Sequence, residues 1–495
     1  MNGSFILSVD QGTSGTKPIL IDAQGRVMAK GTEPLQTLYR EQGWVEQDPE
    51  AIVHNVLASV RACLNEFRAG GGNLSDIKAC GISNQRETFV LWDGQGQPLY
   101  NAVVWQCKRS IPVCERMKEE GLDEPIRAKT GLVIDPYFSS SKVVWLYENE
   151  PHIRQAIDSG NAFFGTVDTW ILYRLTNGRQ YYTDYTNASR TMFFHLENLE
   201  WDKELLARFR LSGLRLPEPK PSAAFFGESS FGGLFAEPLP IMSMIGDSHA
   251  AAFGEGCFVP GTAKATLGTG CSILMNIGSS VKPSANGMVT TICWSLENRI
   301  DYALEGVIVT CGATIEWLKN SLSLFADSRE TEAMAFSVAD NGGVYLVPSF
   351  SGMGAPYWDP GRKASISGLT FGSTKAHLVR AALESIAYQI RDVIEVMERD
   401  SGIALGQLMI DGGITSNRFI TLFLADLLAK PVVNIGLPDV SALGAAYLAG
   451  LQQGLFRDPD HLKSLSRSYT VIHPGADQEK VRGYYAGWKT AVDRS

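Results

Sequence analysis

The sequence VDQGTSGTKP at residues 9–18 decides the fold, because it sets small residues and an acid at the tip of an apolar hairpin. Mainly apolar residues lead into this turn at 5–9 and out of it at 19–21. A second turn, LGTGC at residues 267–271, lies in the same apolar context in the second half of the chain. Glycine-rich hairpin tips bring backbone N–H groups close to an anion. Either turn alone is typical of an ordinary hairpin, but the pair, with Asp10 at the mouth of the first, indicates a phosphate clamp.

Two later segments repeat each other in the same way. Residues 76–85 (DIKACGISNQ) and 405–413 (LGQLMIDGG) each predict a short apolar strand that ends in a glycine or asparagine turn. The chain therefore predicts an α/β fold with two related halves that close on one cleft, and residues 212–240 read as a surface excursion. Helical patterns alternate with these strands, the clearest at residues 48–68, 374–399 and 441–455.

Length and composition narrow the class of protein. A chain of 495 residues exceeds what one hydrophobic core usually supports, which favours two domains. Glycine and proline punctuate residues 253–261, so we expect an N-terminal domain over 1–254 and a C-terminal domain over 255–495. The net charge of −9, without any Lys/Arg cluster, argues against a nucleic-acid partner.

The same composition predicts where the chain works. No stretch approaches the length of a membrane span, and Met1 to Ser4 carry no basic signal-peptide region, so we expect a cytoplasmic chain without membrane insertion. The eight cysteines include no C-x-x-C pair. We expect them to be reduced, mainly buried side chains that form neither a disulfide framework nor a zinc site.

Asp247 is the candidate catalytic carboxylate. It follows an apolar strand and precedes a small-residue helix, beside the predicted hinge, where a carboxylate faces the cleft between two halves. A helix N-cap role is equally compatible with this position, and one residue can serve both. His249, two residues later, is expected to be a helix-start or core histidine because nothing nearby offers metal-ligand spacing.

Other residues suit a sugar-like ligand and a nucleotide. Arg86 and Glu87 follow a buried strand and offer donors and acceptors for adjacent hydroxyls of a polyol, although a solvated ion pair is the default interpretation. Trp105 and Tyr137 supply apolar faces with polar edges that suit sugar-like ligands, although such residues usually belong to the core. Neither a G-x-x-x-x-G-K-[ST] motif nor an early G-x-G-x-x-G motif occurs. Two hairpins with an acid beside each therefore point to ATP and Mg²⁺ between the halves, with Lys17 as a candidate phosphate ligand or simply an edge-strand lysine.

Together these features resemble the FGGY carbohydrate-kinase family, within the actin/hexokinase-like (ribonuclease H-like) ATPase fold, and its glycerol kinases in particular. The resemblance runs from Phe5 to Ala491. Its markers are DQGT at 10–13, GISNQRET at 81–88, NAVVWQC at 101–107, TGLVIDPYFS at 130–139, GTVDTW at 165–170, TDYTNASRT at 183–191, GAPYWDP at 354–360 and DGG at 411–413.

The resemblance implies a role for each candidate residue in an ATP-dependent phosphorylation of glycerol to glycerol 3-phosphate. Asp247 would be the general base, and Asp10 and Asp247 would place Mg²⁺. It also implies a homodimer or homotetramer. The polyol would contact Arg86, Glu87, Trp105, Tyr137, Asp247 and Ser248, and ATP would contact Thr13, Ser14, Gly15, Lys17, Thr269, Gly312, Glu316, Gly413 and Asn417.

Two departures from the family pattern keep alternatives open. This chain has Ser248 where glycerol kinases typically have glutamine, and Ser272 where they typically have an aromatic residue. Both changes are from large to small, so a kinase for a larger polyol or a ketose is a second interpretation, which the presence of Arg86, Glu87, Trp105 and Tyr137 opposes. A third, a non-catalytic nucleotide-dependent binding or regulatory protein, is opposed by the presence of Asp10 and Asp247.

Overall fold

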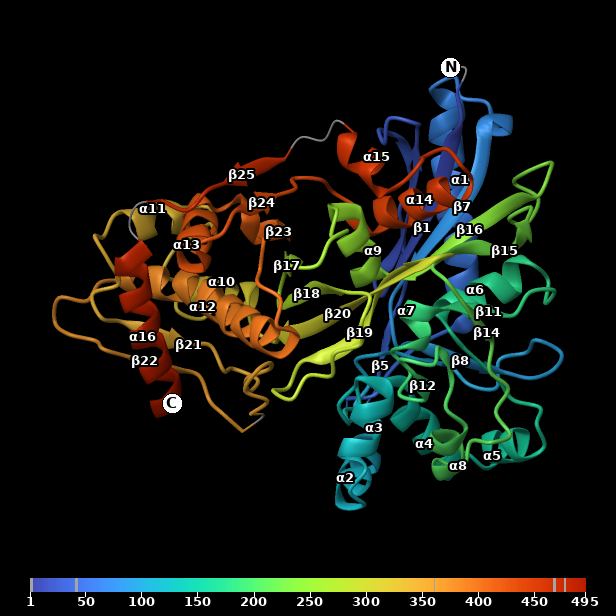
Figure 1. Cartoon of the computed structure of the whole chain (residues 1–495), viewed down its shortest axis with the longest axis horizontal. Coiled ribbons are helices and arrows are strands. Elements are labelled where there is room, and N and C mark those ends of the chain that lie inside the picture. The colour runs from blue at the N-terminus through green and yellow to red at the C-terminus, as the bar shows by residue number, and fades with distance from the viewer. Residues whose placement is uncertain (1–2, 41–42, 360, 466–468, 476–477) are drawn as a thin grey trace.

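The computed structural model describes residues 3–40, 43–359, 361–465, 469–475 and 478–495. Met1 and Asn2 of the N-terminal segment, and Pro360 of the GAPYWDP motif, lie outside these residues. Two seven-stranded sheets form the scaffold, one in each half of the chain. The N-terminal half, blue to green, lies on the right of Figure 1, and most of the C-terminal half, yellow to red, extends to the left.

The two sheets share one pairing order. In the first, β1 (Phe5–Gly12) and β2 (Gly15–Ile21) form an antiparallel hairpin, and β7 (Ile77–Asn84) pairs with β1 in parallel. In the second, β17 (Thr262–Leu267), β18 (Cys271–Gly278) and β23 (Gln407–Asp411) repeat this pattern. This confirms the prediction of two related halves built on two hairpins. The first sheet runs β15 (Ala223–Ser229), β16 (Leu239–Gly246), β7 (Ile77–Asn84), β1 (Phe5–Gly12), β2 (Gly15–Ile21) and β3 (Val27–Lys30), with β4 (Glu33–Pro34) on β2; the second runs β19 (Val289–Leu296), β20 (Arg299–Ile308), β18 (Cys271–Gly278), β17 (Thr262–Leu267), β23 (Gln407–Asp411), β24 (Val432–Asn434) and β25 (Thr470–Ile472).

Smaller sheets and the helices complete the fold. A five-stranded sheet runs β10 (Phe163–Thr166), β8 (Phe89–Trp92), β9 (Ala102–Val103), β6 (Val45–Gln47) and β5 (Leu38–Tyr39), and three strand pairs are β11 (Tyr182–Asp184) with β14 (Glu218–Lys220), β12 (Phe194–His195) with β13 (Glu200–Trp201), and β21 (Tyr345–Val347) with β22 (Ser365–Ser367). The helices are α1 (Pro49–Ala69), α2 (Ile111–Glu119), α3 (Asp123–Thr130), α4 (Ser139–Asn149), α5 (Pro151–Asp158), α6 (Val167–Leu175), α7 (Tyr185–Ala188), α8 (Lys203–Arg208), α9 (Asp247–Glu255), α10 (Gly312–Asn320), α11 (Glu330–Phe336), α12 (Lys375–Ser401), α13 (Arg418–Leu428), α14 (Val440–Gln452), α15 (Pro459–Ser464) and α16 (Gln478–Arg494).

The three predicted helices correspond to α1, α12 and α14. The start of α1 shows the local cause, since the Asp48 side chain accepts a hydrogen bond from the Glu50 backbone N–H at 2.9 Å. The prediction for residues 212–240 is wrong in part. They include β15, an edge strand of the first sheet, and the buried rings of Phe226 and Phe231 belong to the hydrophobic core of that half.

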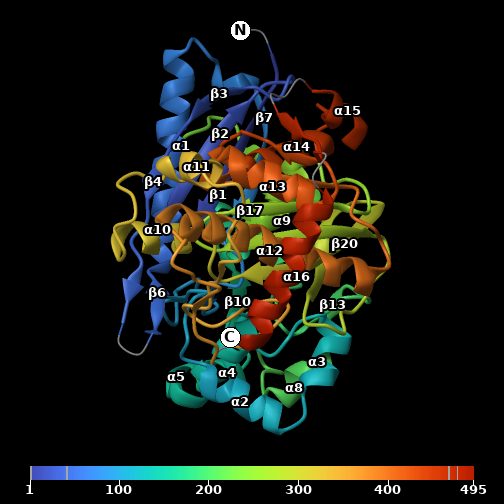
Figure 2. The same cartoon turned by 90° about the vertical axis from the view of Figure 1, so that its left-hand side faces the viewer.

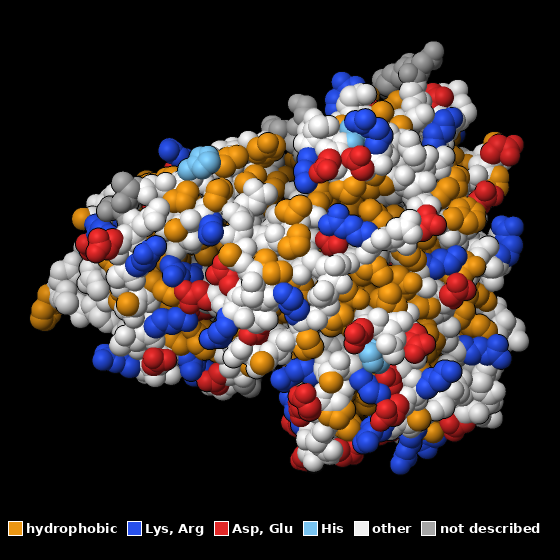
Figure 3. All heavy atoms as spheres, viewed as in Figure 1, with side chains coloured by type: hydrophobic (Ala, Val, Ile, Leu, Met, Phe, Trp, Pro, Cys, Tyr) orange, Lys and Arg blue, Asp and Glu red, His pale blue; other side chains and the backbone are white. Residues whose placement is uncertain are grey.

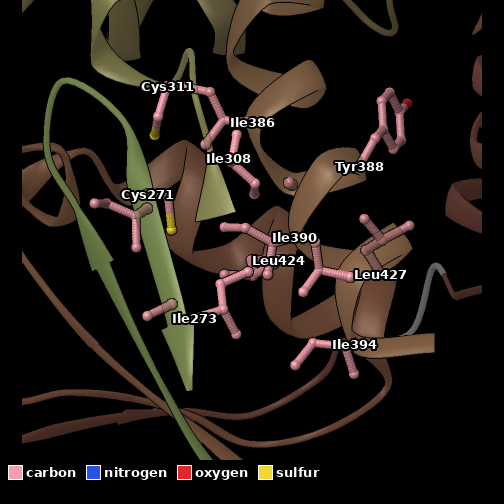
Figure 4. Close-up of a cluster of buried hydrophobic side chains, with 14 of the residues drawn as sticks. Cys271, Ile273, Ile308, Cys311, Ile386, Tyr388, Ile390, Ile394, Leu424 and Leu427 are labelled. Atoms are coloured by element: carbon pink, nitrogen blue, oxygen red, sulfur yellow. The ribbon is translucent and has the colours of Figure 1, made fainter. Parts of the chain in front are cut away.

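A hydrophobic core braces the second hairpin from behind. Cys271 and Ile273 of β18 face Ile386, Ile390 and Ile394, which recur every four residues on α12 (Figure 4). Figure 2 shows α12, α13 and α16 in front of the C-terminal half. The position of the hairpin tip therefore depends on a long, well-packed helix rather than on the loop itself.

Helices α9 and α14 join the two halves. Helix α14 packs against β1, β7 and β16, whereas α9 contacts β17, β18 and β19, and the two helices pack against each other. A Cβ atom at Gly444 would lie 1.8 Å from the Ala250 carbonyl oxygen, and one at Gly254 would lie 2.4 Å from that of Val440. Two backbones can approach this closely only where both glycines lack side chains.

The surface and the cysteines agree with the compositional expectations. On the face shown in Figure 3, Lys/Arg and Asp/Glu side chains are interspersed over both halves rather than gathered in one basic stripe. All eight cysteines are buried. Of the helices in the described segments, none is long and apolar enough to cross a membrane.

We predict that Gly444→Ala lowers the free energy of unfolding by about 1–3 kcal/mol or more, because the new methyl group overpacks the joint between α9 and α14. Urea denaturation followed by circular dichroism measures this. The matched control is Gly483→Ala in α16, where a Cβ atom meets nothing within 4 Å, and stability should stay equal or rise by up to about 1 kcal/mol. Equal stability of the two variants would contradict the close approach.

Candidate active site

Two neighbouring cavities share the tip of the second hairpin, and one of them also reaches the tip of the first. The central cavity, of about 720 Å³, is lined by residues of both halves, and the lateral cavity, of about 910 Å³, by residues of the C-terminal half. Gly268 and Thr269, in the turn of the second hairpin, line both. One ligand can therefore extend from the lateral cavity past the hairpin tip into the central one.

Most residues predicted from the sequence come together in these cavities. Ser14, Gly15 and Lys17 line neither; Lys17 is exposed on β2, with its Nζ 3.9 Å from Oδ1 of Asp439. The central cavity is lined by Asp10, Thr13, Arg86, Glu87, Trp105, Tyr137, Asp247, Ser248 and Thr269, and the lateral cavity by Thr269, Gly312, Glu316, Gly413 and Asn417.

Parallel strand pairing brings the key side chains of the N-terminal half to one edge. In register, Asp10 of β1 lies beside Ser83 of β7, and Asn84 lies beside Gly246 of β16. The carboxyl ends of these strands therefore meet, which is where α/β sheets bind ligands. Asp247 is the first residue of α9, and Gly246 before it is the N-cap. The alternative role of Asp247 as the helix N-cap is therefore wrong. Its Oδ1 accepts a hydrogen bond from the Ser248 N–H at 2.6 Å.

Arg86 and Glu87 form a charged floor of the central cavity, and each pairs with a buried charge outside the lining, Glu305 or Arg190. Arg86 donates to both carboxylate oxygens of Glu305, at 2.8 and 3.2 Å, and its Nε lies 3.4 Å from Oδ1 of Asp247. Arg190 lies 2.6 Å from Glu87 and 2.6 Å from Glu305. Arg86 and Glu87, adjacent in sequence, are 4.0 Å apart, so each takes its main partner elsewhere. We call Arg86, Arg190, Glu87 and Glu305 the charge cluster.

The charge cluster is electrically balanced and spans the two halves. Burial opposes ionisation of Glu305, but the guanidinium groups of Arg190 and Arg86 outweigh it and hold the pKa of that carboxyl well below its ordinary value. Burial raises the pKa of Glu87, and the same two arginines oppose the shift. Because Glu305 comes from β20 of the C-terminal half, the cluster links the halves directly at the cavity.

Sequence reasoning missed two members of this cluster. Arg190 stands in the TDYTNASRT motif but received no role, and Glu305 received none either. The available signal for Glu305 was a single carboxylate within the apolar strand YALEGVI at residues 302–308, since a buried charge needs a partner. That signal does not identify the partner, because both arginines are more than 100 residues away in sequence.

A second group of acids lies where the strands of both halves end. Desolvation, and then the nearby Asp247 carboxylate, raise the pKa of Asp10 to about 7, while a hydrogen bond from Ser83 at 2.8 Å opposes the shift. Asp411, beside Thr266 in the second sheet, also lines the central cavity, and its buried Oδ1 has no hydrogen-bond partner. Mutual repulsion and an unpaired carboxylate oxygen both favour a cation at this end of the cavity.

Trp105 and Tyr137 form an aromatic wall of the central cavity. The Trp105 indole N–H donates to Oγ1 of Thr13 at 2.9 Å, and the Tyr137 ring meets the Trp105 ring edge-on at 5.4 Å. The Lys142 ammonium, wholly buried, donates to the carbonyl oxygens of residues 136, 137 and 138 at 2.6, 2.8 and 2.9 Å. These bonds hold the backbone that carries Tyr137, so the wall is rigid.

His249 belongs to the core, as predicted. Its side chain is fully buried, and its Nε2 lies 3.4 Å from Oγ1 of Thr291 in β19. Burial, followed by the positive charge of Arg86, holds its pKa well below the ordinary value, so the ring is neutral.

Comparison with known proteins gives a consistent result over the whole chain. Residues 5–254 match the N-terminal domain, and residues 263–452 the C-terminal domain, of the FGGY family of carbohydrate kinases. Glycerol kinase from Symbiobacterium thermophilum is 45% identical, with 100% of this chain and 99% of that protein covered. Glycerol kinase 2 from Thermotoga maritima is 44% identical over 99% of this chain and 98% of its own.

Solved structures agree with this assignment. The crystal structure of Plasmodium falciparum glycerol kinase with ADP has a TM-score of 0.94 and 35% identity, covering 99% of this chain and 98% of that one. Xylulose kinase from Lactobacillus acidophilus has a TM-score of 0.88 at 21% identity, over 99% of each chain, which is a likeness of fold.

We predict that Glu305→Gln lowers the free energy of unfolding by about 3–5 kcal/mol, because it leaves two buried guanidinium groups with one carboxylate. Chemical denaturation at neutral pH measures this. Asp327→Asn is the control, since Asp327 pairs with Arg329 at an exposed site and its loss should change stability little. A Glu305→Gln protein as stable as the control would show that the charge cluster does not stabilise the fold.

Proposed function

The chain belongs to the FGGY family of carbohydrate kinases, and from that premise we propose that it transfers the γ-phosphoryl group of ATP to a primary hydroxyl of glycerol. The observation that carries this proposal is the central cavity. There Arg86, Tyr137 and Asp247 of the N-terminal half face the turn of the second hairpin, which continues into the lateral cavity. The glycerol kinases that resemble this chain over its full length support the choice of polyol.

The polyol lies on the charge cluster and against the aromatic wall. Arg86 donates to hydroxyl oxygens, Glu87 and Asp247 accept from hydroxyl protons, and Trp105 and Tyr137 pack against carbon atoms. The Tyr137 hydroxyl lies 3.4 Å from the Arg86 guanidinium, so the wall and the charged floor meet at one corner. Balanced charges suit a neutral, hydroxyl-rich substrate better than an ionic one.

Asp247 acts as the general base. Its side chain is 40% exposed within the cavity, unlike the buried members of the charge cluster, and it can therefore reach a substrate hydroxyl. As the hydroxyl proton passes to Asp247, the hydroxyl oxygen forms a bond to the γ-phosphorus. The bond from that phosphorus to the β,γ-bridging oxygen breaks, and ADP leaves with the electron pair. Closure of the halves keeps water from replacing glycerol as the acceptor.

ATP occupies the lateral cavity, with its phosphates directed past Thr269 to the central one. Gly312, Glu316, Gly413 and Asn417 contact the nucleoside part, and Thr13 and Thr269 contact the phosphates. The Asn417 side chain caps α13, where its Oδ1 accepts from the Ile420 N–H at 3.3 Å, so the helix start is fixed beside the nucleotide. The phosphate contacts of Ser14, Gly15 and Lys17 are supported by the family resemblance alone.

The acids at the strand ends fit a magnesium ion. Asp10 and Asp247 would hold it, with the unpaired Asp411 oxygen nearby, and when bound it would neutralise charge on the transferring phosphoryl group. Among the described residues, no three His, Cys, Asp or Glu side chains form a complete metal site. Two carboxylates with phosphate oxygens and water are the usual Mg²⁺ ligands at such sites.

We extend the proposal to the setting of the enzyme. Buried, unpaired cysteines suit a reducing compartment, which supports the cytoplasm. Family resemblance supports a homodimer or homotetramer. We also propose that the domain boundary lies between residues 254 and 255, near the end of α9.

We predict that Asp247→Asn lowers kcat by about 10²–10⁴ while ADP binding stays within a few fold of wild type, because the base is lost but the lateral cavity is intact. Coupled ADP release and titration calorimetry measure the two properties. Asp460→Asn, at a side chain 87% exposed on α15, should leave both unchanged. If Asp247→Asn retained more than about a tenth of wild-type kcat, Asp247 would not be the general base.

A further inference from the structure

The Lys264 ammonium lies in the wall of the central cavity with hydrogen-bonding capacity to spare. Its side chain is 1% exposed on β17, and it donates to Oγ of Ser248 at 2.9 Å and to Oγ1 of Thr266 at 3.0 Å. An ammonium group has three donors. Within the described segments no other acceptor and no carboxylate lies within bonding distance of this nitrogen. A buried ammonium with one unused donor beside a cavity is suited to a ligand oxygen.

Two serine hydroxyls extend this group across the cavity. Oγ of Ser248 lies 3.2 Å from Oγ of Ser272, and Ser272 donates to Oε1 of Glu305 at 3.4 Å. Both serines line the central cavity, and each comes from a different half. Lys264, Ser248 and Ser272 thus form a continuous polar row that ends at the charge cluster, and we call it the lysine–serine row.

We propose that the lysine–serine row is a subsite for one further hydroxyl, so that the enzyme phosphorylates a four-carbon polyol whose terminal hydroxyl bonds Lys264 and the two serines. This inference rests on the proposed function, since it names a substrate class for the same cavity. The Lys264 ammonium can donate a hydrogen bond and either serine oxygen can accept one. A substrate hydroxyl can accept the first and donate the second.

The charges around the row favour a neutral hydroxyl over an acid group. The cavity lining holds the cations Arg86, Lys108 and Lys264 and the acids Asp10, Glu87, Asp247 and Asp411. Arg190 and Glu305 of the charge cluster add one charge of each sign beside it. Acids outnumber bases, and Glu305 directly contacts the row through Ser272. A substrate carboxylate bound to Lys264 would also lie near the Glu305 carboxylate, whereas a hydroxyl brings no second negative charge there.

The test compares two substrates that differ only at the proposed contact. Erythritol has a hydroxyl on its fourth carbon, and butane-1,2,3-triol has the same carbon skeleton with a methyl group there. With full-length protein, ATP and Mg²⁺, we expect kcat/KM for erythritol to exceed that for the triol by about tenfold or more, because the triol leaves the buried Lys264 donor unpaired. A cavity that merely has room for a fourth carbon would treat the two alike.

Substitutions assign the effect to the row. Lys264→Met and, as a smaller change, Ser272→Ala should each bring the ratio of kcat/KM for erythritol to that for the triol towards one. Lys78→Met, at an exposed lysine whose ammonium bonds a backbone carbonyl of residue 75, should keep the wild-type ratio. Thermal denaturation of each variant confirms that it is folded. If Lys264→Met does not fold, the ratio measured with Ser272→Ala tests the subsite.

The outcomes separate this inference from the proposed function. Phosphorylation of glycerol with equal kcat/KM for erythritol and the triol would overturn the subsite and leave the kinase assignment intact. A uniform loss of kcat for all three substrates in Lys264→Met, with the ratio unchanged, would assign the ammonium to the phosphoryl group and also overturn it. No turnover of any polyol by the wild type would overturn the proposed function itself.

Discussion

The pairing of four buried charges across the two halves is the interaction on which the central cavity depends. Arg86 and Glu87 leave the N-terminal sheet at the end of β7, Arg190 follows α7, and Glu305 comes from β20 of the C-terminal sheet. None of these side chains can remain charged without the others, because each is almost removed from water. Two of these groups, Arg86 and Glu87, also line the cavity and present a donor and an acceptor to a substrate. Stability and recognition draw on one set of contacts.

Strand pairing and one helix contact position the remaining groups of the site. Parallel pairing aligns the carboxyl ends of β1, β7 and β16, which places Asp10 and Asp247 at one edge, and the repeated pairing order does the same for Asp411 in the other sheet. The glycine contacts between α9 and α14 bring the two edges face to face. A hairpin braced by α12 then lies between a cavity suited to a polyol and one suited to a nucleotide.

Local patterns in the sequence predicted the features that depend on local chemistry. The hairpin turns, the three predicted helices, and the positions of Arg86, Trp105, Tyr137 and Asp247 at the cavity follow from periodicity, glycine content and motif resemblance. Glu305 and Lys264 could not be assigned, because their partners come from other strands and depend on how the sheets are juxtaposed. The burial of β15 was missed for the same reason, since a segment rich in glycine and proline gives no sign of the strand it will join.

The central claim is that the cavity transfers phosphate to a carbon-bound hydroxyl rather than to water. Phosphorus NMR of the wild-type protein with ATP, Mg²⁺ and glycerol tests it most directly. The account predicts one phosphomonoester on a primary carbon for each ADP formed, and negligible inorganic phosphate. Release of inorganic phosphate without a phosphomonoester, or ADP formation that does not depend on the polyol, would contradict it.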